Sequence, residues 1–237
     1  MSIRIVSLRV GRPRSFGVAG AADPLDRPWT SAIAKEAVDR PLWLSTTGLE
    51  GDAVADTRVH GGPEKAVLVG AAAHLPFFRA LIGSDAVGPG AFGENLVIEG
   101  ATEADVCIGD SFAVGEALVQ ISQPRQPCWK QARRWRRREL ALEIQRSGRT
   151  GWYLRVLREG RVAPGDELRL VERPLPGWTV ARANEVMHGR PVDREAAAAL
   201  AALPQLAPNW REALARLASR GPEEPGTRLL GPERDRA

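Results

Sequence analysis

The chain has 237 residues, 43% of them hydrophobic, so it can bury a proper core in one large domain or in a medium domain with a small one. Lys and Arg number 33 against 29 Asp and Glu, and this net charge of +4 permits an anionic ligand without arguing for nucleic acid. Two cysteines are too few for a disulfide scaffold. The sequence shows neither a secretory signal nor an apolar run of the ~20 residues that a membrane span needs, so we do not expect a secreted or membrane protein. We therefore expect a cytoplasmic protein with free thiols.

The first half of the chain predicts short strands separated by turns. Alternating apolar residues predict an opening strand over residues 3–10. The following stretch, residues 11–30, is rich in Gly, Pro and Asp and predicts a loop. The other elements expected here are strands over 31–38, 42–44 and 65–69, a turn over 47–52, a helix over 72–82 and a glycine-rich loop over 89–95.

The next part of the chain continues the pattern of short strands. A single helix is expected over residues 129–146, directly after Cys128. The expected strands are 96–98, 111–114, 118–122, 152–157 and 167–171. Regular short strands with turns between them are typical of a barrel or sandwich, so the predicted fold class is mainly β.

The composition changes after a Pro- and Gly-containing linker at residues 174–177. Three Ala-rich helices are expected, over 179–187, 193–203 and 209–219. Thr179, Asp193 and Asn209 are suitable residue types for their N-caps. The predicted organisation is a β domain at 1–173, a three-helix domain at 178–220 and a flexible polar tail at 221–237.

The strongest local signal for chemistry is Cys128, which follows two prolines and begins a predicted helix. Helix N-termini carry partial positive charge, and Arg125 and Lys130 lie nearby in sequence. Both effects favour the thiolate, the form that acts as a nucleophile or a soft metal ligand. A small buried residue is an equally good interpretation on these residues alone. Cys107 lies in a strand-like stretch without a basic neighbour, which favours a structural role.

Three further motifs could contact a ligand. The two glycines after His60 let the backbone approach a ligand closely, and His60 and Lys65 could contact an anion; a tight turn is the alternative. The motif at residues 92–95 could bind a ligand or stabilise a turn, and the aromatic pair at 152–153 could wall a pocket or pack the core. The residues that these motifs offer to a ligand are His60, Gly61, Gly62, Lys65, Phe92, Gly93, Glu94, Asn95 and Trp152.

Arginine supplies nearly all the positive charge, since the lysines are Lys35, Lys65 and Lys130. Residues 133–138 form an arginine-rich run around one tryptophan, which could contact nucleic-acid phosphates. Glu139 and Glu143 offset much of this charge, and a solvated helix face is the favoured interpretation.

Taken together, these segments resemble the MOSC superfamily, and in particular its YiiM-type proteins. Each motif alone is weak, but several in a fixed order make a strong match that extends over about residues 30–172. The helices that follow resemble the three-helix domain of YiiM-type proteins. The matching segments are Thr47-Gly-Leu-Glu-Gly-Asp52, Val59-His-Gly-Gly-Pro63, Phe92-Gly-Glu-Asn-Leu96, Gly109-Asp110, residues 115–125, Pro127-Cys128, Lys130 and Gly151-Trp-Tyr153.

The resemblance implies a MOSC-type β-barrel with a few peripheral helices and a pocket for the molybdenum cofactor, molybdopterin. In this family a cysteine that matches Cys128 is the protein ligand to molybdenum, and the pterin dithiolene and oxo or hydroxo groups complete the set. Family members reduce N-hydroxylated compounds such as hydroxylamino bases and amidoximes. The residues expected to hold the cofactor or its phosphate are His60, Gly61, Gly62, Lys65, Phe92, Gly93, Glu94, Asn95, Gln123, Arg125, Lys130 and Trp152.

The expected partners are a small N-hydroxylated substrate and an external electron donor, either a reductase or a ferredoxin-like protein. The chain has too few cysteines for an iron–sulfur cluster and no GxGxxG motif for a nucleotide cofactor. The loop at 11–30 and the arginine run do not match the family pattern, and either could alter substrate access or partner docking.

Two other functions stay open at this level. A Cys128 persulfide could make the protein a sulfur carrier. The arginine run and the three-helix domain could form a nucleic-acid-binding or interaction module, which is the least favoured interpretation.

Overall fold

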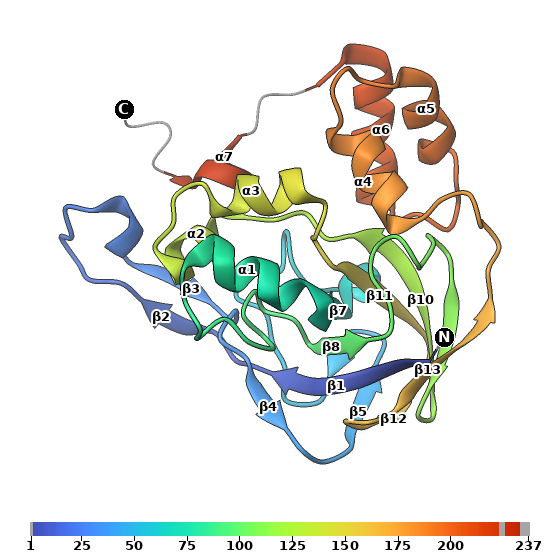
Figure 1. The fold of residues 1–237 in the computed structure, drawn as a ribbon, viewed down its shortest axis with the longest axis horizontal. Helices are drawn as coiled ribbons and strands as arrows, with labels where there is room; N and C mark the ends of the chain where they lie inside the picture. Colours follow the sequence, from blue (N-terminus) through green and yellow to red (C-terminus); the bar gives the residue numbers. More distant parts are fainter. Residues whose placement is uncertain (1, 223–225, 233–237) are drawn as a thin grey trace.

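A closed barrel forms the centre of the computed structural model, which describes residues 2–222 and 226–232 (Figure 1). Seven strands close the ring because β13 pairs with both β9 and β1. Neighbouring strands run antiparallel, except that β7 and β8 are parallel. In order around the ring the strands are β13 (Glu167–Glu172), β9 (Ser111–Val114), β10 (Ala117–Pro124), β11 (Trp152–Arg158), β7 (Val67–Ala71), β8 (Leu96–Glu99) and β1 (Ile3–Val10). The predicted barrel is confirmed.

Apolar side chains from alternating strand positions fill the barrel. Ile5 and Leu8 of β1, Ile98 of β8 and Ile121 of β10 are each 1% exposed or less. Trp152, at the start of β11, belongs to the same buried cluster. This rigid interior fixes the strand ends from which the loops of the candidate site emerge.

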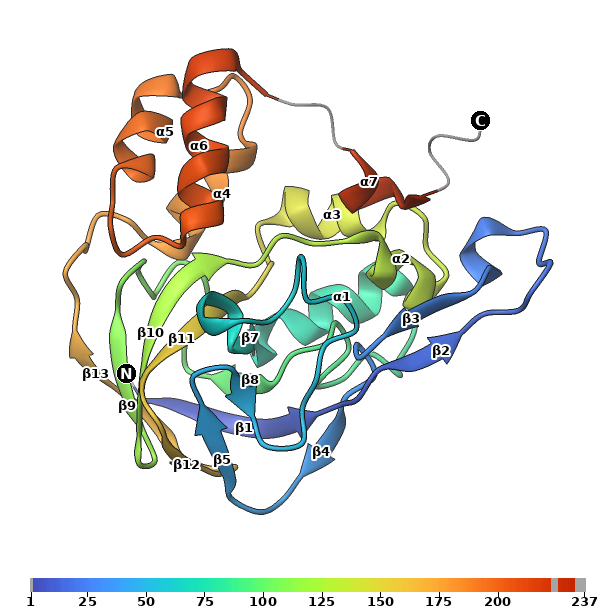
Figure 2. The same ribbon diagram turned by 180° about the vertical axis from the view of Figure 1, so that it is seen from behind.

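Shorter strands extend the barrel on its outside. β4 (Glu36–Val38) pairs with β1, and β5 (Leu42–Ser45) pairs with both β6 (Gly48–Leu49) and β12 (Gly160–Val162). Figure 2 shows β5 from behind, next to the loop that leads to β7. The strand expected over 31–38 is divided into β3 (Trp29–Ser31) and β4, which belong to different sheets and are joined by residues 32–35.

The prediction of a continuous loop over residues 11–30 is wrong, because a short strand lies near each end of this stretch. β2 (Arg14–Phe16) pairs with β3 in a hairpin that projects from the barrel, with the short 3-10 helix η1 (Pro24–Asp26) near its tip (Figure 1). The rings of Phe16 and Trp29 stack with centroids 4.7 Å apart, and this cross-strand pair helps to hold the hairpin together.

Helices cover one side of the barrel (Figure 1). The helix predicted over 129–146 is two helices, since Arg136 between them adopts a left-handed conformation with φ of 51°. The backbone N–H of Arg136 closes the end of the first helix by donating to the carbonyl oxygens of Ala132 and Arg133, and its side chain pairs with Asp26. The elements on this side are the 3-10 helix η3 (Ala72–His74) and the helices α1 (Leu75–Ile82), α2 (Trp129–Trp135) and α3 (Leu140–Ser147). The 3-10 helix η2 (Pro63–Lys65) lies on the opposite side, against β10 and β11 (Figure 2).

Three helices follow the barrel as predicted: α4 (Val180–His188), α5 (Arg194–Ala201) and α6 (Pro208–Arg220). Two of the expected N-caps are confirmed, because Thr179 accepts a hydrogen bond from Arg182 N and Asp193 accepts one from Ala196 N. The third, Asn209, is wrong. Ala207 occupies the N-cap, since Pro208 already has the fixed φ of a first helical residue.

The C-terminal segment folds back onto the barrel where a flexible tail was expected. It forms α7 (Thr227–Leu230), in which Leu229 is 2% exposed because the helix packs against α2 and α3. The rest of the expected tail, at 223–225 and 233–237, lies outside the described residues. Within the described part of the chain, no helix has the length and hydropathy to cross a membrane.

Candidate functional site

A cavity of about 640 Å³ opens beside the barrel, and all three lysines of the chain line it. Its walls come from the link between β3 and β4, the β5–β6 hairpin, the loop before η2, the loop before β8 and the turn from β10 to α2. The predicted site residues that line this cavity are His60, Gly61, Gly62, Lys65, Phe92, Gly93, Asn95, Arg125, Cys128 and Lys130. The fold therefore gathers motifs that are far apart in sequence around one space.

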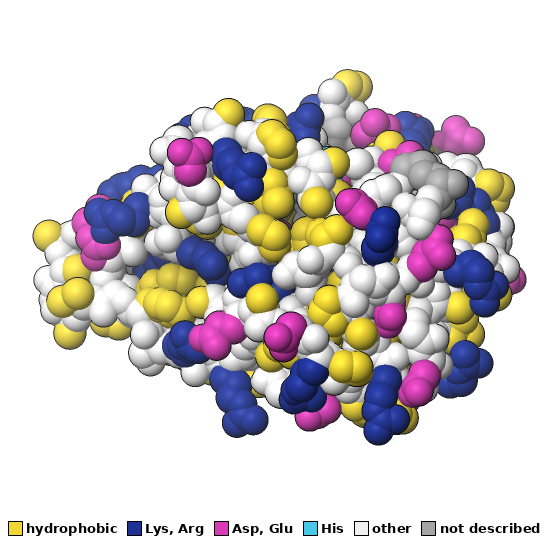
Figure 3. All heavy atoms as spheres, turned by 60° about the horizontal axis from the view of Figure 1, so that its bottom comes forward, with side chains coloured by type: hydrophobic (Ala, Val, Ile, Leu, Met, Phe, Trp, Pro, Cys, Tyr) yellow, Lys and Arg dark blue, Asp and Glu magenta, His cyan; other side chains and the backbone are white. Residues whose placement is uncertain are grey.

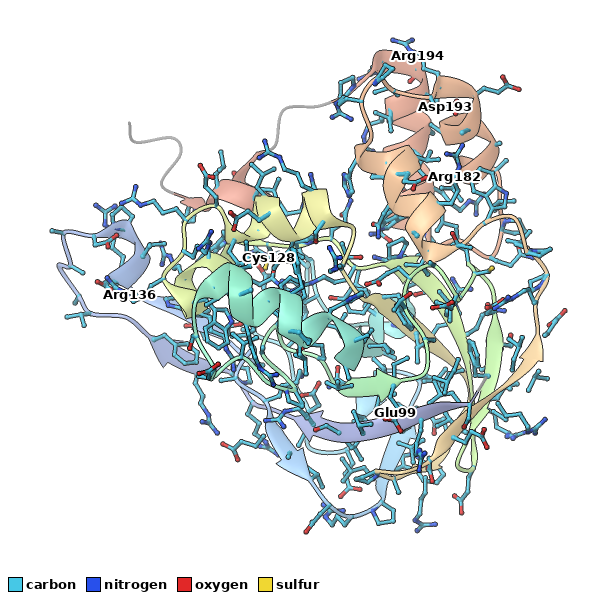
Figure 4. All side chains as sticks on the ribbon, in the orientation of Figure 1. Glu99, Cys128, Arg136, Arg182, Asp193 and Arg194 are labelled. Carbon is cyan, nitrogen blue, oxygen red and sulfur yellow. The ribbon has the colours of Figure 1, made fainter. Side chains whose placement is uncertain are left out.

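Cys128 lies in the turn between the end of β10 and the start of α2, and it is half-buried at the cavity wall. It is the N-cap residue of α2, and its backbone N–H donates to the side-chain oxygen of Gln131 at 3.3 Å. Figure 4 shows Cys128 where α2, α3 and α7 come together. The thiol is thus accessible from the cavity and held by a structured backbone.

Cationic side chains surround the same part of the cavity. Arg125 is 6% exposed and donates to the carbonyl oxygen of Phe92 at 3.2 Å, and Lys65 Nζ donates to the carbonyl oxygen of Val59 at 2.8 Å. Burial, followed by the charges of Lys130, Arg125 and Lys65, lowers the pKa of His60 to about 4. A histidine kept neutral by burial and by three nearby cations marks a pocket suited to an anion.

A buried network forms another wall of the cavity. Lys35 pairs with Asp52, and their side chains are 7% and 10% exposed. Asp52 also accepts hydrogen bonds from Gly11 N at 2.7 Å and from Asn95 Nδ2 at 2.8 Å. Burial lowers the pKa of Lys35 even though Asp52 raises it. Asn95 uses its amide oxygen for Leu68 N at 3.1 Å, so it supports the wall rather than reaching out to a ligand.

The loop before η2 has a backbone that requires glycine. Gly61 and Gly62 have φ of 71° and 81°, where side chains with a Cβ are strained. Gly93, with φ of 91°, lies so close to the link between β3 and β4 that an added Cβ would come within 3.2 Å of Ile33 Cγ1. The glycines thus shape the walls of the cavity.

Three predicted residues do not line the cavity. Glu94 accepts a hydrogen bond from Phe92 N at 3.0 Å, and Gln123 is 1% exposed in β10. Trp152 packs into the barrel core, because neighbouring residues of a strand point to opposite faces. Tyr153, which was not among the predicted site residues, lines the cavity in its place, and strand alternation was the signal for it.

Tyr153 is the single tyrosine of the chain and lies within reach of the reactive groups. Burial raises the pKa of its hydroxyl, and Cys128 raises it further. Arg125 lowers this pKa through its charge and through a hydrogen bond. Its strand pairs with Gln123 of β10 on one side and Leu68 of β7 on the other. The site therefore presents a neutral hydroxyl from a rigid strand.

Cys107 is buried, whereas Cys128 is half-buried at the cavity wall. Cys107 is 1% exposed, and burial raises the pKa of its thiol. Its sulfur donates weakly to the carbonyl oxygen of Pro176 at 3.6 Å, in the region where the barrel joins the three-helix domain. These contacts fit the structural role expected for it.

The arginine run mainly holds the projecting hairpin. Arg133 donates to the carbonyl oxygens of Arg27 at 3.0 Å and Pro28 at 3.3 Å. Arg136, labelled in Figure 4, and Arg138 both pair with Asp23, at 3.5 Å each. The run and the hairpin, which do not match the family pattern, are thus one structural unit.

The donor set of the cavity fits a metal that brings other ligands with it. Among the described residues, no group of three His, Cys, Asp or Glu side chains could hold a metal ion. A metal at Cys128 would have one soft protein thiolate and would take its remaining ligands from an organic cofactor. The volume of about 640 Å³ lies within the usual range for cofactor sites.

Comparison with known proteins agrees with this architecture. The MOSC domain model matches residues 56–169, and the model of the YiiM-like 3-alpha helix domain matches residues 178–220. YflK of Bacillus subtilis is 39% identical over 207 residues, which are 87% of this chain and 90% of YflK. YiiM of Escherichia coli is 36% identical over 84% of this chain and 90% of its own length.

Two further comparisons bear on structure and activity. A protein of Gibberella moniliformis named "Reductase" is 36% identical over 84% of this chain, which spans 35% of that longer protein. The crystal structure of YiiM from Geobacillus stearothermophilus superimposes with a TM-score of 0.75 at 33% identity, over 91% of this chain and 99% of that one. By its fold, its domain order and these relatives, the chain belongs to the YiiM-type proteins of the MOSC family.

Proposed function

We propose that this protein is a molybdenum-cofactor-dependent reductase of N-hydroxylated compounds, with Cys128 as the protein ligand to molybdenum. The observation that carries the proposal is the place of this thiol, half-buried on a cavity of about 640 Å³ that all three lysines line. MOSC domains are generally associated with the molybdopterin cofactor, and one relative of the chain is named a reductase.

The cationic groups would hold the phosphate of the cofactor. The basic side chains of Lys65, Lys130 and Arg125 lie near His60, whose pKa of about 4 keeps it neutral at neutral pH. A neutral imidazole can donate or accept a hydrogen bond without adding a further charge. Because the glycine-rich loop before η2 offers backbone beside Lys65, we assign the phosphate to this side of the cavity.

The bound cofactor would supply removal of oxygen from nitrogen with two electrons, the net reaction being R–NHOH + 2e⁻ + 2H⁺ → R–NH₂ + H₂O. The side chains of this protein would orient the substrate and deliver protons. Tyr153 offers a hydroxyl hydrogen that burial keeps in place, and Arg125 contacts its oxygen. The hydroxyl would donate to the substrate oxygen and so favour its departure as water.

The electrons would come from another protein. The chain has two cysteines, fewer than the four that an iron–sulfur cluster requires. We therefore propose a reductase or ferredoxin-like donor that approaches the open side of the cavity, and a cytoplasmic setting that supplies it.

The two competing functions fit the same features less well. A sulfur carrier needs a reactive thiol, but it does not need a large cavity rimmed by cations. A nucleic-acid-binding module needs a basic surface. Figure 3 shows a face on which basic and acidic side chains are interspersed, and the arginines at 133, 136 and 138 are engaged with the hairpin.

Reduction of a hydroxylaminopurine and of an amidoxime by anaerobically purified protein tests the proposal, with a reduced viologen dye as the electron source. We expect turnover in the wild type and in Cys107→Ser, and none in Cys128→Ser. Equal turnover in Cys128→Ser would contradict the proposal. A trapped persulfide on Cys128 without molybdenum would instead support the sulfur carrier, and RNA or DNA binding that weakens steeply with salt would support the third function.

A further inference from the structure

The C-terminal helix α7 packs beside the segment that carries Cys128. Figure 1 shows it lying against α2 and α3. It lies beyond both family matches, which end at residues 169 and 220. The functional roles carried by those domains therefore do not account for it.

Arg228 of α7 links the segment before Cys128 to α3. Its guanidinium donates to the carbonyl oxygen of Pro127 at 2.6 Å and to Oε1 of Gln145 in α3 at 2.8 Å. Pro127 and Arg228 are 101 residues apart in sequence. The next residue of the helix, Leu229, is 2% exposed, and its burial anchors α7 beside Arg228.

Arg228 also lies close to the sulfur. Burial lowers the pKa of its guanidinium, Cys128 acts to raise it, and Arg125 acts to lower it further. The charge of this half-buried arginine needs good hydrogen bonds to offset its partial loss of water. The two carbonyl acceptors provide these bonds.

The backbone before Cys128 needs such an anchor. Pro127 has no N–H, so it contributes to hydrogen bonding only through its carbonyl oxygen. The N–H of Cys128 makes a long bond of 3.3 Å to Gln131, while Arg125 N is fixed by Gly151 O at 3.0 Å. The bond from Arg228 thus holds the peptide that joins Pro127 to Cys128.

We propose that Arg228 is a positioning residue for Cys128: by holding the carbonyl group of Pro127, it sets the direction in which the sulfur enters the cavity. The C-terminal segment is then part of the cofactor site rather than a tail. The effect on turnover rests on the proposed function, whereas the effect on the Cys128 backbone does not.

Hydrogen exchange on the full-length, cofactor-free protein tests the contact directly. In Arg228→Gln, the amides of residues 128–132 should exchange at least about tenfold faster, because a charged hydrogen bond to the preceding peptide is lost. Arg228→Lys should restore part of the protection, since an ammonium group cannot bridge both acceptors. Unchanged exchange in Arg228→Gln would overturn the proposal.

Arg211→Gln is the matched control. Arg211 also donates to a backbone carbonyl, that of Ala201 at 3.2 Å, but it does so inside the three-helix domain. We expect this variant to leave exchange at 128–132 unchanged. A similar increase in both variants would reveal general loosening of the structure and would overturn a specific role for Arg228.

Turnover of the cofactor-loaded enzyme shows whether Arg228 positions the sulfur of Cys128 or only stabilises the surrounding structure. Arg228→Gln should lower kcat at least about tenfold and change KM by less than about twofold, because the sulfur moves while the substrate contacts stay. Faster exchange with unchanged kcat would overturn the positioning role. Faster exchange in a protein whose wild type has no reductase activity would support the contact and count against the proposed function alone.

Discussion

Replacement of Asp52 by Asn tests the buried ion pair in the cavity wall. The carboxylate pairs with Lys35 and accepts hydrogen bonds from Gly11 N and Asn95 Nδ2. The paired side chains are 7% and 10% exposed. Removal of the negative charge would therefore leave the ammonium of Lys35 buried without its counterion.

The expected cost is large for a single substitution. Breaking a buried pair by removing one partner costs about 3–5 kcal/mol, a large part of the ~5–15 kcal/mol that stabilises a typical domain. The cost should shrink as pH rises towards 10. Burial already lowers the pKa of Lys35, and without Asp52 it falls further, so the folded variant loses the Lys35 proton before the unfolded chain does.

Urea unfolding at neutral and alkaline pH measures this effect. Glu50→Gln is the matched control, because Glu50 pairs with Arg40 at 3.4 Å with side chains 54% and 61% exposed. We expect this variant to lie within about 1 kcal/mol of the wild type. The double variant Lys35→Met/Asp52→Asn should be more stable than Asp52→Asn, since no unpaired charge stays buried.

A loss below about 1 kcal/mol in Asp52→Asn would refute this reasoning. So would a loss that does not change between neutral and alkaline pH. Either result would mean that water reaches Lys35, and the wall of the cavity would then be less closed than the contacts indicate.

Three other predictions follow from the same site. Tyr153→Phe should lower kcat about 10²-fold or more and leave cofactor content unchanged, as steady-state kinetics and metal analysis would measure; equal kcat would remove the hydroxyl from the mechanism. The free energy of unfolding should fall as pH drops from about 6.5 to 4, because the unfolded chain takes up a proton at His60 where the folded protein, with a pKa of about 4, does not. In His60→Asn the fall should be smaller, and an identical acid profile would contradict that pKa. Cys107→Ser should keep kcat within about twofold, and a loss like that of Cys128→Ser would show that the wrong thiol was assigned.

The barrel and the three-helix domain could be predicted because their signals are local. Alternation of apolar residues marks each strand, and Thr179 and Asp193 mark helix starts by their side-chain chemistry. The break at Arg136 could not be seen in the same way. It needs a left-handed backbone at a residue other than glycine, which no local pattern marks, and the side chain of Arg136 pairs with Asp26 of the distant hairpin.

The site was predictable to the extent that sequence motifs specify its walls. Most of the selected residues do line one cavity, since glycines and cations in ordered motifs reflect backbone turns and charge. The choice between Trp152 and Tyr153 depended on which face of β11 turns inward, and the register of the barrel decides it. The approach of α7 to Cys128 depends on packing of Leu229, for which the local sequence has no signal.

Metal and pterin analysis of anaerobically purified protein, wild type beside Cys128→Ser, tests the central claim most directly. The account predicts molybdenum and pterin in equal amounts in the wild type and loss of molybdenum from Cys128→Ser, with both proteins folded. Molybdenum retained at the same level without the thiol, or a persulfide and no molybdenum in the wild type, would contradict it.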